Sequence, residues 1–247
     1  MNIKKLFISA ALMLAAFASV ANAQEEKKYI EPLEEGVKQR IRDWQDQKFG
    51  LFIHWGTYSV TGVIESWSLD PRHIEWCYKF RPKDMSYEEY VRSYENLITQ
   101  FNPVSFDPET WAKAAKYAGM KYMVFTTKHH DGFSMFDTQQ NDYKITSDRC
   151  PFHTSPKANI AKELFDAFRA EGIMPGAYFS IADWYNDDFW WDYFPPKDSS
   201  PNYPIDRFPE KWNRYLDFVN AQVDELTGGE YGDLQMLWFD LATNIPL

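Results

Sequence analysis

The 247 residues have a formal net charge of -10, with 26 Lys and Arg against 36 Asp and Glu. No basic patch offsets this charge, so the composition argues against nucleic-acid binding. Aromatic residues make up 18% of the chain, including 10 Trp and 15 Tyr. Such an excess suits a protein that stacks against flat, partly apolar faces such as sugar rings.

Residues 1–23 have the pattern of a cleavable signal peptide. A basic head is followed by the apolar run Leu6–Val20 and by the small-x-small site Ala21-Asn22-Ala23. We therefore expect a mature chain that begins at Gln24 and is secreted or periplasmic. The apolar run is short for a membrane span and polar sequence follows it, so no membrane insertion is expected after the signal is removed.

Beyond residue 23, apolar runs alternate with helical segments. Residues 24–47 predict a helical lead-in, and Ser86–Gln100 has helical spacing. Four apolar runs predict strands at Gly50–Trp55, Tyr122–Thr127, Pro175–Ile181 and Leu234–Asp240. Caps and periodicity predict the helices between the strands at Asp107–Ala118, Ile160–Glu171 and Pro209–Leu226.

These strands lack apolar–polar alternation, which predicts burial on both faces and a parallel sheet. We expect an α/β fold, the N-terminal half of a (β/α)8-type (TIM-like) barrel, with residues 24–247 as a partial catalytic domain. The sequence ends at Leu247, soon after the fourth strand, so the second half of the barrel is expected to be absent. A complete doubly wound sheet is the alternative.

Polar side chains gather where the predicted strands end. His54 ends the first strand, His129 and His130 follow the second, Tyr178 lies on the third and Asp240 ends the fourth. Adjacent histidines point to opposite sides of a regular strand, so they can act together only if the strand breaks. Lys128 before the pair and Gly132 after it indicate such a break. Two long loops, 57–80 with Glu65 and Trp67, and 182–207, join these strands.

This set of residues is open to three interpretations. Three His and one Asp can bind a catalytic metal, although H-x-H and H-E-x-x-H spacings are missing. The histidines can instead be hydrogen-bonded core residues, with Asp240 as a helix cap. In sugar chemistry, a strand-end carboxylate attacks an anomeric carbon while His and Tyr bind hydroxyls and Trp covers the apolar face. Cys77 and Cys150 lack zinc-type spacing; whether they form a disulfide stays open.

The motifs K-F-G-L-F-I-H-W-G, T-K-H-H-D-G-F, G-A-Y-F-S and L-W-F-D follow one another in this order. The series resembles that of glycoside hydrolase family 29, the retaining α-L-fucosidases, from about Phe49 to Asp240. The resemblance implies a fucosylated glycan or glycoside as substrate and no metal or organic cofactor. It leaves the oligomeric state and the linkage preference open.

The resemblance also implies roles by position. His54, His129 and His130 match fucose-binding histidines, and Tyr178 matches a contact near the reacting centre. Asp240 matches the catalytic nucleophile, and Trp238 matches a substrate-contacting Trp. Glu65 and Trp67 correspond to a Glu-Trp contact pair of the family, with Ser66 between them here.

Two departures from the family pattern concern the catalytic groups. The family usually continues the nucleophile motif with Gly, whereas Leu241 and Ala242 stand here. The general acid/base of the family generally lies after the nucleophile strand, and a β-sandwich follows the barrel; we expect neither in this chain. Within this chain Glu65 is the candidate acid/base, with Asp183 as a weaker one. A non-catalytic fucose-binding or degenerate fragment is therefore the alternative function.

Overall fold

The computed structural model describes residues 31–72, 75–78 and 80–241, so the expected signal peptide lies outside the described residues. The chain divides into two compact units, one up to Asp46 and one from Gln47 onward. The helix α2 (Glu35–Gln47) lies almost entirely in the first unit; it confirms the predicted lead-in from residue 35 onward, whereas residues 31–34 are not helical. Among the described residues, no helix is both long enough and apolar enough to span a membrane.

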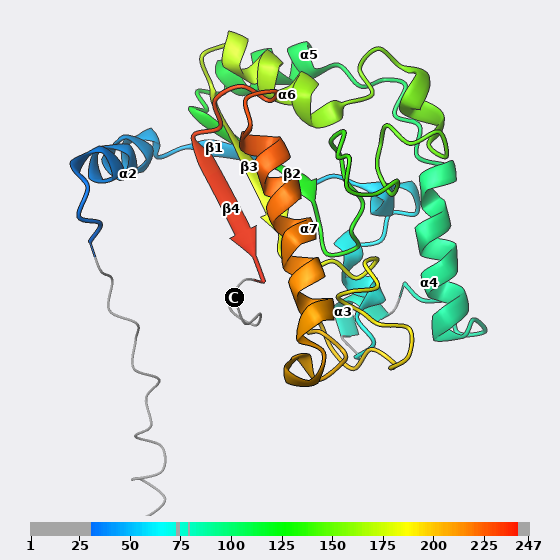
Figure 1. Cartoon of the computed structure of the whole chain (residues 1–247). Coiled ribbons are helices and arrows are strands. Elements are labelled where there is room, and N and C mark those ends of the chain that lie inside the picture. The colour runs from blue at the N-terminus through cyan, green and yellow to red at the C-terminus, as the bar shows by residue number, and fades with distance from the viewer. Residues whose placement is uncertain (1–30, 73–74, 79, 242–247) are drawn as a thin grey trace, which may run out of the picture. The chain divides into compact units, whose positions relative to one another are not determined.

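The second unit is built on a four-stranded parallel sheet (Figure 1). Its strands lie side by side in chain order, as β1 (Gly50–Ile53), β2 (Tyr122–Lys128), β3 (Met174–Ser180) and β4 (Met236–Asp240). All four predicted strands are present, with ends shifted by one or two residues. Since every strand runs in the same direction, all their carboxyl ends meet at one edge of the sheet. This confirms the predicted partial α/β barrel.

Burial differs between the inner and the outer strands. Almost every residue of β2 and β3 is buried, whereas β1 and β4 are half-exposed, with Phe52 45% and Phe239 43% exposed. The prediction that all four strands are buried on both faces is therefore wrong for the outer pair. Among the described residues each outer strand has one neighbouring strand, so one of its sides is left open.

Side-chain caps determine where several helices begin. Ser86 and Glu89 form a capping box at α4 (Tyr87–Glu95), which the 3₁₀ helix η3 (Asn96–Thr99) continues. The Asp107 carboxylate accepts from the Thr110 amide at α5 (Pro108–Tyr117), and the Asn159 side chain caps α6 (Ile160–Ala170). The last helix of the described residues is α7 (Pro209–Thr227). The predicted helices are thus confirmed within a few residues.

The helices bury their apolar faces against the sheet and each other. The helices α5 and α6 pack together, and α6 lies against β2 and β3. The helix α7 contacts the end of β2, where the Gln222 side chain accepts from Lys128. It also contacts the segment after β3, because the Tyr215 hydroxyl donates to the Ile181 carbonyl. The core is formed by rings and aliphatic side chains from these elements, including Phe125, Phe165 and Phe179.

Short helices form parts of the segments that connect the strands and longer helices. The first long loop contains the 3₁₀ helices η1 (Thr57–Val60) and η2 (Glu65–Leu69) and the helix α3 (Glu75–Tyr78). Two more 3₁₀ helices are η4 (Pro151–Thr154) and η5 (Ile205–Arg207). Cys77 and Cys150 are both buried and are not joined in a disulfide. Instead, the Cys150 thiol donates to the Phe101 carbonyl at 3.2 Å.

The chain turns sharply after β2, which confirms the strand break that we predicted from Lys128 and Gly132. The pairing of β2 with β3 shifts register between Thr126 and Lys128, and the strand ends there. Gly132 has φ +78°, and a Cβ atom at this position would lie 2.3 Å from Asp183 Oδ1. A side chain is therefore disfavoured both by backbone strain and by lack of space. The turn places both histidines at the edge of the sheet.

Candidate active site

The strand-end residues form one cluster at the carboxyl edge of the sheet. His129 and His130 follow β2, and their ring centroids are 3.9 Å apart. His54 follows β1, with its ring 4.6 Å from that of His129. Tyr178 on β3 stacks against His129 at 5.7 Å. The sequence predicted that these side chains would meet, and they do.

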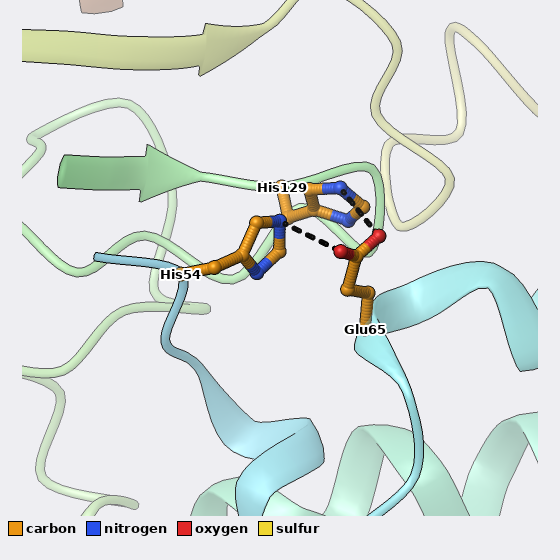
Figure 2. Close-up of side chains that lie close together, drawn as sticks. All are labelled: His54, Glu65 and His129. Atoms are coloured by element: carbon orange, nitrogen blue, oxygen red, sulfur yellow. Dashed lines mark ion pairs between the residues drawn. The ribbon is translucent and has the colours of Figure 1, made fainter. Parts of the chain in front are cut away.

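The Glu65 carboxylate faces two of the imidazoles, His54 and His129 (Figure 2). Its carboxylate oxygens are 3.6 Å from His54 Nε2 and 3.8 Å from His129 Nε2. These gaps are longer than hydrogen bonds, so a hydroxyl group can bridge the carboxylate and either ring. Glu65 begins η2 with φ +54°, an uncommon conformation for a residue with a side chain. The turn directs the carboxylate toward the strand ends.

Asp240 ends β4 with both carboxylate oxygens occupied. The Tyr178 hydroxyl donates to Oδ2 at 2.5 Å, and the Leu241 amide donates to Oδ1 at 2.7 Å. His130 Nε2 is 3.9 Å from Oδ2. Leu241 has φ +55°, so the chain turns here although the family's usual glycine is missing. The departure from the family motif therefore leaves the carboxylate at the edge of the sheet.

Aromatic rings line the cluster on two sides. Trp238 on β4 is 49% exposed and stacks on Phe52 of β1, with ring centroids 5.5 Å apart and an angle of 11°. Trp67 in η2 contacts the His130 ring edge-to-face at 4.9 Å and the Trp184 ring at 5.7 Å. A half-exposed indole beside a carboxylate provides an apolar surface on which a sugar ring can stack.

Burial keeps the imidazoles neutral. It lowers the pKa of His54 to about 4, although the Asp240 carboxylate opposes the shift. The pKa values of His129 and His130 are also lowered, again chiefly by burial. For Glu65, burial and then the negative charge of Asp240 raise the pKa above its usual value. At neutral pH the imidazoles therefore act as hydrogen-bonding groups without a positive charge.

The same side chains also fall into two groups that could hold a metal ion. These are His54 with Glu65 and His129, and His129 with His130 and Asp240. Within each group, one ligand atom from every residue lies within 4.8 Å of the others. Nitrogen and carboxylate oxygen are ordinary zinc ligands. The metal alternative is therefore compatible with this geometry.

Several contributing residues were missed by the sequence analysis. The Tyr58 hydroxyl contacts His54 Nδ1 at 2.7 Å, Ser66 Oγ contacts His129 Nδ1 at 2.5 Å, and Ser180 Oγ contacts His130 Nδ1 at 2.7 Å. A buried imidazole needs a partner for its second nitrogen. That requirement could have drawn attention to Ser180, at the end of a predicted strand, and to Ser66, between two predicted site residues.

A buried ion pair lies behind the cluster. Lys128 Nζ is 3.1 Å from Asp183 Oδ2, and both side chains are 0% exposed. Asp183 also accepts from the amides of Tyr185 and Asn186 through Oδ1. Asp183 is thus a structural residue, and its weaker candidacy as an acid/base is wrong because a substrate cannot reach it. The pair joins the end of β2 to the segment after β3.

The family model described as alpha-L-fucosidase matches residues 16–246. This chain belongs to the alpha-L-fucosidase family. The tissue alpha-L-fucosidase of Macaca fascicularis is 32% identical over 183 residues, which are 71% of this chain and 36% of that protein. The chain thus spans little more than a third of the length of this curated relative.

Solved structures of the family have the same fold as this chain. Alpha-L-fucosidase isoenzyme 1 from Paenibacillus thiaminolyticus superposes with a TM-score of 0.61 at 39% identity, covering 83% of this chain and 43% of that chain. An alpha-L-fucosidase GH29 from Bacteroides thetaiotaomicron, trapped as a covalent intermediate with 2-fluoro-fucosyl fluoride, gives 0.61 at 28% identity. That match covers 86% of this chain and 43% of the other.

Proposed function

We propose that this chain acts as a retaining exo-glycosidase that releases terminal α-L-fucose from glycoconjugates, with Asp240 as the nucleophile. The observation behind the proposal is the Asp240 carboxylate, which lies at the carboxyl edge of the sheet beside a histidine cluster. Hydrogen bonds from Tyr178 and from the Leu241 amide orient it. Family membership supports fucose as the sugar, and the trapped covalent intermediate of a relative supports the covalent route.

In the first step, an Asp240 oxygen forms a bond to the anomeric carbon while the bond from that carbon to the aglycone oxygen breaks. A carboxylic acid gives its proton to the departing oxygen. In the second step, water attacks the anomeric carbon, the same carboxylate takes a proton from this water, and Asp240 is released. Two inversions give L-fucose with its configuration retained.

We assign the acid/base role to Glu65. Burial and the Asp240 charge raise the pKa of Glu65, which favours the protonated form that an acid requires. Its Oε2 atom lies 3.8 Å from His129 Nε2, and His129 is also close to Asp240, so one imidazole lies near both carboxyl groups.

His54, His129 and His130 bind sugar hydroxyls in this proposal, as neutral imidazoles. Trp238 and Trp67 cover the apolar parts of the ring. Tyr178 holds the nucleophile through its hydroxyl. Each of these side chains lies in the cluster described above.

Turnover of an aryl α-L-fucoside by the purified chain tests the reaction, with Asp240→Ala as the variant. We expect phenol release by the wild type, loss of release in Asp240→Ala, and α-L-fucose as the first sugar product in proton NMR. Release that persists in the variant would refute the assignment of the nucleophile. Fucose binding without release would instead favour the non-catalytic alternative.

The role of Glu65 can be separated from simple sugar binding by varying the leaving group. If Glu65 protonates the aglycone oxygen, Glu65→Gln should slow fucosides with poor leaving groups far more than those with activated phenols. Equal slowing of both substrates would instead make Glu65 a sugar ligand.

We also propose that the protein is secreted or periplasmic, because residues 1–23 have the signal-peptide pattern. N-terminal sequencing of the exported protein should find Gln24 first. A product that retains Met1 would refute this.

A further inference from the structure

The adjacent buried histidines His129 and His130 each contact a serine hydroxyl through Nδ1, but one hydroxyl donates to the ring and the other accepts from it. His130 Nδ1 contacts Ser180 Oγ at 2.7 Å, and the Ser180 hydroxyl donates its hydrogen to the Ala182 carbonyl at 2.6 Å. A hydroxyl has one hydrogen, so toward His130 the Ser180 oxygen can only accept. Nδ1 of His130 must therefore carry the proton. In the neutral ring, Nε2 of His130 then has a free lone pair.

His129 is in the opposite situation. Its Nδ1 contacts Ser66 Oγ at 2.5 Å, and among the described residues the Ser66 hydroxyl has no other hydrogen-bond partner. Ser66 is fully buried, so its hydrogen goes to the imidazole. Nδ1 of His129 is then the acceptor and Nε2 carries the proton. This N–H faces Glu65 Oε2 at 3.8 Å, a donor opposite an acceptor.

The lone pair on His130 Nε2 faces no hydrogen-bond donor among the described residues. Nε2 is buried and makes no hydrogen bond among the described residues, and it lies 3.9 Å from Asp240 Oδ2, another acceptor. The Oδ2 atom already accepts from the Tyr178 hydroxyl. An unpaired buried acceptor is costly, so this nitrogen is suited to a donor that arrives with the ligand.

We propose that Ser66 and Ser180 are positioning residues that hold His129 and His130 in opposite tautomers, so that the pair presents one N–H donor and one lone pair to a single sugar hydroxyl. The geometry allows this, because one nitrogen of each ring and an Asp240 oxygen lie within 4.8 Å of one another. The hydroxyl accepts from His129 Nε2 and donates to His130 Nε2. Burial supports the arrangement by keeping both rings neutral. Only the identity of the hydroxyl as part of fucose rests on the proposed function.

Long-range ¹H–¹⁵N NMR spectra of the full chain, labelled with ¹⁵N-histidine at pH 7 and without ligand, report the tautomers directly. We expect a protonated Nδ1 in His130 and a protonated Nε2 in His129. In Ser180→Ala the His130 pattern should change while His129 keeps its own, and Ser180→Thr, which retains a hydroxyl, should restore it. Ser66→Ala should change His129 instead.

Thr127→Val is the matched control. The Thr127 hydroxyl is equally buried and donates to the Tyr178 carbonyl at 2.7 Å, and it has no hydrogen bond to His129 or His130. Both histidine patterns should therefore survive in this variant. A wild-type His130 protonated at Nε2, or an unchanged His130 pattern in Ser180→Ala, would overturn the assignment. The wild-type spectrum decides this even if a variant fails to fold.

Aryl fucosides with one hydroxyl replaced by fluorine test the ligand side, because fluorine cannot donate. One analogue should lose about 5- to 150-fold in kcat/KM with the wild type. The loss should be clearly smaller with Ser180→Ala, whose His130 can change tautomer. The NMR spectra can confirm the tautomers while every analogue loses the same factor in kcat/KM with the wild type and with Ser180→Ala. That result would refute the proposal that one sugar hydroxyl binds both histidines. Absence of fucoside turnover by the wild type would refute the proposed function and leave the tautomers untouched.

Discussion

Replacing Lys128 by Met should strongly destabilise the fold behind the histidines. Lys128 Nζ lies 3.1 Å from Asp183 Oδ2 and 2.9 Å from the Gln222 side-chain oxygen, and it packs over the Phe179 ring at 4.3 Å. Met keeps the length of the side chain and removes its charge. The Asp183 carboxylate would then be buried without a counter-charge.

The expected cost follows from complete burial of both partners. Removing one member of a buried pair typically costs about 3–5 kcal/mol, because the other charge is left uncompensated. Lys116→Met is the matched control, since Lys116 forms a 2.9 Å pair with Glu171 and its side chain is 59% exposed. Exposed pairs of this kind are worth about 0–1 kcal/mol.

Urea unfolding followed by circular dichroism measures both free energies. The double variant Lys128→Met/Asp183→Asn should be less destabilised than Lys128→Met, because the introduced amide has no charge while its oxygen can still accept from the Tyr185 and Asn186 amides. A coupling of at least about 1 kcal/mol is expected. Equal costs for Lys128→Met and Lys116→Met, or strict additivity in the double variant, would refute the argument.

Three further predictions concern charge, binding and metal. Burial raises the pKa of Asp131 to about 6, so between pH 4 and pH 6 the folded state holds a proton that the unfolded state lacks. The Asp131 contribution to the free energy of unfolding should therefore fall by about 3 kcal/mol over this range as the pH rises. The variant Asp131→Asn should lack this decrease. Parallel plots of the free energy of unfolding against pH for the wild type and the variant would contradict the prediction. Trp238→Ala should raise KM for an aryl fucoside about tenfold by removing the half-exposed stacking surface. A midpoint of unfolding that drops sharply, with KM unchanged, would make Trp238 structural. Treatment with EDTA should leave fucoside turnover unchanged, and a loss restored by Zn²⁺ would establish the metal alternative.

The order of elements could be predicted because it depends on local signals. Tyr122–Lys128 is an apolar run that ends in polar residues, and Asp107 before Pro108 is a preferred residue pair at a helix start. Parallel strands then bring their ends to one edge, which is why His54, His129 and Asp240 could be expected together. The apolar runs alone do not reveal the half-exposure of the outer strands, because it depends on which strands have neighbours on both sides, although a half-barrel leaves strand edges exposed.

The partners of the site residues follow from contacts between distant parts of the chain. Ser66 is 63 positions from His129, and Ser180 is 50 positions from His130. No periodicity links such residues. Asp183 looked like a free acid in the sequence because nothing nearby in the chain neutralises it; its counter-charge, Lys128, is 55 positions away.

The turn η2 has a practical consequence for protein engineering. Its first residues Glu65, Ser66 and Trp67 each contact an imidazole of the cluster. The far end of the turn is held from outside, where Arg81 donates to the Ser68 and Asp70 carbonyls. Three consecutive residues therefore contact all three histidines of the cluster, while the Arg81 hydrogen bonds keep the far end of the turn in place. A small saturation library at Trp67, with the proposed acid/base Glu65 and the positioning residue Ser66 kept, would sample new sugar preferences without altering any strand.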